Sequence, residues 1–367
     1  MIWGLIRGIL KLAVAIVIFL AVAGAVAVVL VEWSCRPGAP VTEAASPLAI
    51  DDAGYKRTEA NTYWTFPEWY IVYSYEDFGQ FLETRPESAF PYADHISGFW
   101  SSFCSANQVA GALPGDHFAY KQMIYIIGVS YTIEIGLKGM YEQTIGRLSE
   151  LFRGPRPTPE DVYARGVAQE YAEFLHQIPW YQFPFMEKLA GLWDAAPFVG
   201  DSPVRNVERH LSLSAEYLVK AGYAKAIAAA AATTEQWPED IMFVVRGDVP
   251  AVLAAEPDVK LVRTLPDGSA LLVAPRYQVF TEIVKRIAAA QSVEIVEIAG
   301  NRHILMTAIV PDGPIPEIEG AREMFVLPMS ARPGFSRVGY DLDVPRLAAI
   351  LREYTAANVE VEHLYDY

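Results

Sequence analysis

The most informative stretch of this chain is IMFVVRGDVPAVLAAEPDVKLVRTLPDGSALLVAPRYQVFTEIVKRIAAAQSVEIVEI, residues 241–298. Apolar runs typical of strands cover 241–245, 259–264, 270–274 and 293–298, and helical patterns cover 250–255 and 277–290. Pro266-Asp267-Gly268 separates the two middle strands as a hairpin turn. The resulting order, β-α-β-β-α-β, is that of a ferredoxin-like split βαβ unit. The sequence therefore predicts an α+β domain with this topology.

The rest of the C-terminal part continues the same alternation. Strands are predicted at 303–310, 324–329, 336–342 and 359–364, and a helix at 345–354. No internal sequence repeat is evident, although strand-helix-strand recurs near the end. We place the ferredoxin-like α+β domain at residues 239–367.

Residues 61–238 have helical patterning instead. Apolar residues recur at helical spacing from His117 to Phe152. Thr158-Pro159-Glu160-Asp161 is a helix start, with an N-cap threonine, a proline in the first turn and acids beside it. A further helix begins near Ser202-Pro203 and ends in an alanine-rich tail. These patterns predict a mainly helical, aromatic-rich domain.

The N-terminal region contains an unbroken apolar run from Leu12 to Val31. A helix of this length rises about 30 Å, the thickness of a bilayer core. The run is too long for a cleaved signal peptide and ends in Glu32-Trp33-Ser34, a poor cleavage site. Residues 1–35 are therefore predicted to be a transmembrane anchor, and residues 36–60, rich in Pro, Ala, Asp and Gly, a linker.

The charges flanking the anchor predict its orientation. Arg7 and Lys11 precede the run, whereas Arg36 alone follows it, beside Glu32. This bias favours a cytoplasmic N-terminus. The predicted location is the inner (cytoplasmic) membrane, single-pass, with the main domain periplasmic or otherwise extracytoplasmic and the lipid bilayer as a partner.

Composition limits the other classes of partner. The 367-residue chain has a formal net charge of −15, which argues against binding nucleic acid. The only cysteines, Cys35 and Cys104, exclude a disulfide framework and a thiolate metal cage. An oxidising compartment would allow them to pair, but we expect two unpaired thiols.

Three aromatic clusters stand out in the helical region, around residues 63–70, 99–103 and 179–186. They contain or adjoin Trp69, Trp100, Trp180 and Trp193. One interpretation is a core built from large side chains. The other is a membrane interface or a pocket for an apolar ligand lined by these four tryptophans.

Several ionisable residues are candidates for acid-base or metal chemistry. Asp94-His95 and Asp116-His117 pair a histidine with an adjacent acid, and Glu134 lies within an apolar stretch. Asp116 is equally well explained as a helix N-cap. Glu134, Lys138 and Glu142 share a helix face, and a solvated stripe is the expected arrangement. No metal or cofactor can be named from this set.

Two further charged patterns have simpler interpretations. Arg205-x-x-Glu208-Arg209-His210 predicts an ion-pair network. Glu173-x-x-His176 has the spacing of a di-iron ligand pair, but the second such motif, Glu360-x-x-His363, falls on a predicted strand. A di-iron site is therefore not expected.

The leading functional hypothesis is a single-pass membrane-anchored envelope protein that binds an apolar, lipid-like small molecule or a membrane protein partner. One alternative is a membrane-bound enzyme acting on a lipid-like substrate through Asp94, His95, Asp116, His117 and Glu134. Another is a structural or assembly subunit of a membrane complex. Neither a nucleophile elbow nor a phosphate-binding glycine loop nor a dinucleotide fingerprint occurs, so no motif in the sequence assigns an enzymatic reaction.

Overall fold

A computed structural model describes residues 22, 24–26, 28–40, 48–115, 117–153, 156–231, 238–290, 292–313 and 318–367. Much of the predicted anchor, Leu12–Val31, lies outside the described residues. Within them, the continuous helix Phe118–Glu150 is long and apolar enough to cross a membrane, with a mean hydropathy of 1.2. A shorter apolar helix, Gly24–Ser34, belongs to the predicted anchor.

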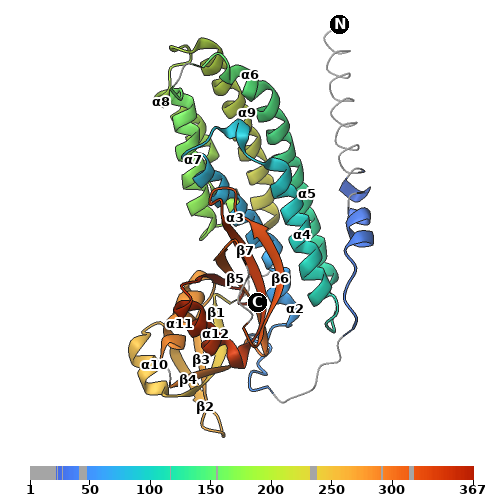
Figure 1. Cartoon of the computed structure of the whole chain (residues 1–367), viewed down its shortest axis with the longest axis vertical. Helices are drawn as coiled ribbons and strands as arrows, with labels where there is room; N and C mark the ends of the chain where they lie inside the picture. Colours follow the sequence, from blue (N-terminus) through green and yellow to red (C-terminus); the bar gives the residue numbers. More distant parts are fainter. Residues whose placement is uncertain are drawn as a thin grey trace.

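Helices fill the chain from Ala60 to Ala231 and form an elongated bundle (Figure 1). They are α2 (Ala60–Trp64), α3 (Phe66–Phe81), α4 (Tyr92–Ala110), α5 (Phe118–Tyr141), α6 (Arg147–Glu150), α7 (Pro159–Leu175), α8 (Phe185–Ala195) and α9 (Pro203–Ala231). Short turns η1 (Glu87–Ala89) and η3 (Trp180–Gln182) lie between them. A π-helical turn, η2 (Glu142–Gly146), joins α5 to α6.

Local sequence explains two of these elements. Thr158 is the N-cap of α7, as predicted, and with Asp161 it forms a capping box in which each side chain accepts from the other residue's backbone N–H. Helix α3 is buried over most of its length, because aromatic residues recur on several of its faces, including Phe66, Tyr70 and Phe78. A helix that is apolar all round belongs inside a bundle.

The first sheet is formed by the stretch 240–298, and its predicted strands and helices are confirmed. The elements are β1 (Asp240–Gly247), α10 (Val249–Ala255), β2 (Lys260–Thr264), β3 (Ala270–Pro275), α11 (Gln278–Ala289) and β4 (Val293–Ile298). The strand order is β2-β3-β1-β4, and every neighbouring pair is antiparallel. The alternating pattern of apolar residues therefore produced the correct elements in the correct order.

The second sheet has the same topology as the first. Its elements are β5 (His303–Pro311), β6 (Ala321–Pro328), β7 (Phe335–Asp343), α12 (Val344–Ala356) and β8 (Glu360–Leu364). The strand order is β6-β7-β5-β8, and every neighbouring pair is antiparallel. In both sheets the order is therefore second strand, third, first and fourth. The chain thus contains a repeated strand arrangement that its residues do not show as a sequence repeat.

The two sheets share one hydrophobic core with α11 and α12. Phe243 and Ile295 of the first sheet, Met306 and Leu342 of the second, and Leu347 of α12 belong to the same buried cluster. The predicted α+β class is therefore confirmed, with mixed helices and antiparallel sheets.

The helical bundle and the second sheet are packed against each other. Phe66 of α3 stacks on Phe325 of β6, with ring centroids 4.3 Å apart. Thr62 of α2 donates to the carbonyl of Tyr365 at 2.5 Å, and Tyr63 donates to the carboxylate of Asp341 at 2.6 Å. These buried contacts join the two parts of the chain into one body.

The predicted linker, 36–60, is not a free tether where the structure describes it. Ile50 is buried, and the backbone N–H groups of Ala49 and Ile50 donate to the carboxylate of Glu297 on β4. A free linker was expected because residues 36–60 lack apolar periodicity. That pattern does not exclude a single extended segment that covers one face of a sheet.

His303 makes the bundle-sheet junction sensitive to pH. Its hydrogen bond with Asp341 raises the pKa of His303 to about 8, although burial opposes this. Stability from this contact is complete below pH 6.5 and is lost as pH rises through 8. The side chain is 42% exposed, so after screening we expect a loss of roughly 1 kcal/mol.

The measurement is chemical denaturation of the full chain at pH 6 and pH 9. His303→Gln should remove this part of the pH dependence while changing stability little at pH 9. An unchanged pH profile in the variant would contradict the assignment.

Candidate functional site

The interior of the helical bundle contains a chain of buried ion pairs that joins α9 to α5, α7, η1 and η2. Arg209 contacts Glu87 of η1 at 2.5 Å and Glu142 of η2 at 2.7 Å. Arg205 contacts Asp161 of α7 at 2.8 Å and Glu208 at 3.0 Å. Both guanidinium groups are almost completely buried. The ion-pair network predicted for 205–210 is confirmed, and it extends well beyond that motif.

The chain of charges continues along the same two helices. Lys138 of α5 contacts Glu87 at 2.8 Å and Glu216 of α9 at 3.0 Å. Lys220 contacts Glu216 at 3.1 Å and Glu134 at 2.8 Å. The predicted solvated stripe of Glu134, Lys138 and Glu142 is therefore wrong, because this face of α5 packs against α9. The ion pairs offset the cost of removing these charged groups from water.

A small cavity of about 40 Å³ adjoins these charges. Its aromatic walls come from α3, α4, α7, α8, α9 and the loop before α8, with Tyr75, Phe78, Tyr92, Tyr171, Phe183, Phe185 and Tyr217. Glu87, Lys138, Glu216 and Lys220 also line it. The cavity is large enough for at least one water molecule, and its charged walls offer the partners that a water needs.

The outer surface of α5 and α9 has the opposite character. Its exposed side chains include Ile126, Leu137 and Met140 on α5 and Leu211, Leu218 and Val219 on α9. Leu137 is 58% exposed and lies next to inward-facing Lys138. A helix of a water-soluble bundle has its apolar stripe inward and its charges outward. Over these positions α5 and α9 have the reverse arrangement, and we call this surface the apolar face.

A shallow apolar groove between α8 and α9 extends this surface. It is lined by Met186, Leu189, Trp193, Ala215 and Leu218, among others. The indole N–H of Trp193 donates to the hydroxyl of Ser214 at 3.0 Å, which fixes the ring at the edge of the groove. Trp193, one of the four predicted ligand-binding tryptophans, therefore lines an open apolar groove.

The other three tryptophans lie elsewhere and do not share a cavity. Trp69 packs on His363 at the junction with the second sheet, with centroids 4.1 Å apart. Trp100 donates to Thr132 at 3.0 Å, between α4 and α5. Trp180 packs on Tyr223 of α9 at 5.2 Å. The structure thus does not bring the four rings into one pocket, because they point from different helices in different directions.

His95 lies in a buried polar cluster with residues that the sequence did not point to. Its Nε2 is 3.1 Å from Asp77, and its Nδ1 is 2.8 Å from the hydroxyl of Ser74. Asp77 also accepts from the backbone N–H groups of Ser330 and Ala331. Burial raises the pKa of Asp77, but the hydrogen bonds from His95 and the loop outweigh it and lower the pKa. This cluster fastens the β6–β7 loop to the bundle.

The other predicted acid-base residues that the structure describes do not join His95. Asp94 is exposed on α4, and Asp116 lies outside the described residues. His117 precedes α5, and its Nε2 contacts the carbonyl of Leu113. Because His95 and His117 lie near opposite ends of α4, helix rise alone separates them by roughly 20 Å. Within the described residues, no group of three metal-ligating side chains occurs.

We call the connected ion pairs around Lys138, Arg205, Arg209 and Lys220 the ionic core. Glu134 is the predicted acid-base residue that belongs to it. It accepts from the hydroxyl of Tyr75 at 2.5 Å and pairs with Lys220. Glu87, Asp161, Glu216 and Lys220 were not among the predicted site residues, although they contribute to this network. A signal for two of them was present in the sequence. Arg205, Arg209, Glu216 and Lys220 recur at helical spacing, which indicates a charged face of α9. The partners on α7 and η1 had no such pattern, since only folding brings them near.

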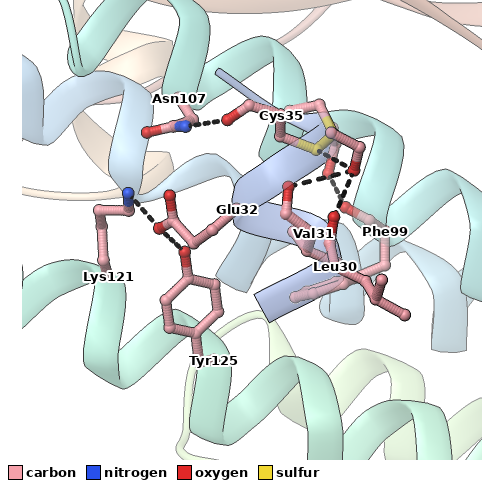
Figure 2. The surroundings of a disulfide bond; sticks show 11 residues. Leu30, Val31, Glu32, Cys35, Phe99, Asn107, Lys121 and Tyr125 are labelled. Carbon is pink, nitrogen blue, oxygen red and sulfur yellow. Dashed lines mark hydrogen bonds and ion pairs between the residues drawn. A yellow bond between two sulfur atoms is a disulfide. The ribbon is translucent and has the colours of Figure 1, made fainter. Parts of the chain in front are cut away.

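Cys35 and Cys104 form a disulfide, with Cα atoms 4.7 Å apart, so the expectation of two free thiols is wrong. Figure 2 shows its surroundings: the side chain of Asn107 donates to the carbonyl of Cys35 at 2.6 Å. Glu32 contacts Lys121 and Tyr125 of α5. These contacts fix the end of the helix Gly24–Ser34 to α4 and α5. Cys35 and Cys104 are 69 residues apart in the chain, so their positions in the sequence did not indicate that they lie close together.

The same helix runs antiparallel to α5. Near its end Glu32 meets Lys121, and eight residues earlier Gly24 approaches Val129. A Cβ at Gly24 would lie 3.2 Å from a methyl of Val129, so the glycine permits close packing of the two helices. Part of the predicted anchor is thus packed directly on α5.

These features define the class of protein: an α+β protein with a helical bundle that has an ionic interior and an apolar face. No protein-family model, no curated protein and no solved structure matches this chain.

Proposed function

We propose that this chain is a membrane-anchored envelope protein whose apolar face binds the acyl region of lipid. The observation that carries the proposal is the reversed polarity of α5 and α9. Their charges pair inside the bundle, whereas Ile126, Leu137, Leu211 and Leu218 are exposed. Exposing such a surface to water is unfavourable, and contact with lipid removes that cost.

The position of the anchor supports this proposal. Gly24 belongs to the predicted span and packs against Val129 of α5. If the anchor crosses the bilayer, the neighbouring part of α5 lies at the same depth. The composition of Phe118–Glu150 is compatible with such an environment.

The disulfide supports an extracytoplasmic location for the end of the anchor. Disulfides persist in oxidising compartments and are rare in the cytoplasm. Cys35 directly follows the apolar helix, and its bond to Cys104 fits a periplasmic position. This agrees with the orientation inferred from Arg7 and Lys11.

We further propose that residues 239–367 comprise a ferredoxin-like unit followed by a second, related unit. The antiparallel order β2-β3-β1-β4 with α10 and α11 supports the first assignment. The recurrence of this order in β6-β7-β5-β8 supports the second. Such a body would serve as the docking or regulatory part of the protein.

The test is site-specific fluorescence quenching of the full-length protein in lipid nanodiscs. Leu137→Cys on α5 and Leu218→Cys on α9 are each labelled with a polarity-sensitive dye, because both positions are exposed. We expect quenching by lipids that carry a nitroxide on the acyl chain and protection from aqueous iodide.

The matched control is Glu170→Cys on α7, whose side chain is 52% exposed and polar in its surroundings. Its label should respond to iodide and not to the acyl-chain nitroxide. Iodide quenching at Leu137 and Leu218 equal to that at Glu170 would overturn the lipid-facing role of the apolar face.

A further inference from the structure

The ionic core contains more carboxyl groups than cations. Seven carboxyl groups are connected through ion pairs within the described residues: Glu87, Glu134, Glu142, Glu150, Asp161, Glu208 and Glu216. Five cations serve them: Lys138, Arg153, Arg205, Arg209 and Lys220. An excess of buried negative charge is unfavourable, and uptake of a cation relieves it.

Glu142 is the member whose contacts leave room for such a cation. Its side chain is 4% exposed, and its Oε1 accepts from Arg209. Its Oε2 is buried and has no hydrogen-bond partner among the described residues. A buried carboxylate oxygen without a partner is costly, whereas a protonated oxygen has lost that charge.

The backbone around Glu142 is also unusual. Glu142 begins the π-helical turn η2, and Gly146 lies one turn later. A Cβ at Gly146 would lie only 2.4 Å from Oε2. The glycine therefore leaves space for the unpartnered oxygen, and π-helical turns of this kind are frequent at functional sites.

We propose that Glu142 is a proton-binding site, with its carboxyl group protonated at neutral pH. The proton comes from a hydronium ion of the solvent, which leaves water, and it binds at Oε2, which converts the carboxylate into a neutral acid. Glu142 does not itself line the cavity at Glu87 and Lys138, but Arg209 bridges Glu142 to Glu87, which does. This inference does not depend on the lipid-facing role of the apolar face.

The groups around Glu142 determine whether it is charged. Burial and the carboxylate of Glu87 on η1 disfavour its charged form, whereas Arg209 and Arg205 on α9 and Lys138 on α5 favour it. Those cations are shared, since Arg209 also contacts Glu87 and Asp161, Arg205 contacts Asp161 and Glu208, and Lys138 contacts Glu216. Tyr92 of α4 and Tyr141 of α5 are the other titratable neighbours.

The experiment is infrared spectroscopy of the full-length protein in mild detergent at pH 7. A protonated carboxyl group gives a carbonyl band separate from that of carboxylates and shifts on deuteration. We expect this band in the wild type, its loss in Glu142→Gln and its retention in Glu208→Gln. Glu208 is the matched control because Tyr141, Ser149 and Arg205 occupy its oxygens.

Two results would overturn the proposal. The first is a wild-type spectrum without the band, or a band that persists in Glu142→Gln. The second is a band that grows when sodium chloride is replaced by choline chloride, because this would assign the site to sodium instead. If Glu142→Gln fails to fold, Glu142→Asp keeps a carboxyl group, and a shifted band frequency in that variant supports the assignment.

Discussion

Arg209→Met should lower the free energy of unfolding by about 3–5 kcal/mol, the cost of removing one partner from a buried ion pair. Arg209 is 1% exposed and contacts Glu87 at 2.5 Å, Glu142 at 2.7 Å and Asp161 at 3.5 Å. Methionine fills a similar volume, so the loss of charge dominates the effect. Chemical denaturation of the full-length protein in mild detergent measures it.

The control is Lys225→Met on the same helix, at an exposed position. Surface substitutions of this kind change stability by about 0.5 kcal/mol or less. A second variant, Arg209→Met with Glu87→Gln, should recover part of the loss, since it also removes a carboxylate left without its cation. An Arg209→Met protein as stable as Lys225→Met would show that the ionic core is open to water.

Removal of the disulfide should have the second largest effect. The bond joins residues that are 69 positions apart, and closing a loop of this length restricts the unfolded chain. For Cys35→Ala with Cys104→Ala we expect a loss of roughly 2–4 kcal/mol in the free energy of unfolding. The end of the anchor should also become more accessible to protease near Pro37, because only noncovalent contacts then hold it.

Reductant provides the internal control for this prediction. Reduced wild type should match the double variant in stability, and the variant itself should not respond to reductant. A wild-type protein whose unfolding is the same with and without reductant would contradict the stabilising role of the bond.

Local patterns accounted for most of the secondary structure. The alternation in 241–298 correctly predicted four strands and two helices, because side chains of a strand point to opposite faces with a period of two. The start signal Thr158-Pro159-Glu160-Asp161 correctly predicted the start of α7, because N-cap contacts lie within one helical turn. Both features depend on residues close together in the chain.

The candidate sites depended far less on local pattern. The inner charges of α9 were predicted as an ion-pair network, yet Glu87 and Asp161 come from elements far from it in sequence. His95 and His117, the histidines that suggested an acid-base site, are separated by the length of α4. Residues adjacent in sequence point in different directions on a helix, so a dipeptide fixes no constellation.

The residues alone determined the α+β class, the order of strands and helices, and the presence of a long apolar segment near the N-terminus, because each follows from short-range periodicity and length. The tertiary structure decided the pairing of Cys35 with Cys104, the packing of the Glu134–Lys138–Glu142 face against α9 and the repeated strand order of the two sheets. These depend on which faces meet when distant segments pack. Which faces meet depends on the free energy of burying surfaces that are formed by many distant residues together, and no short stretch of sequence includes all of these residues.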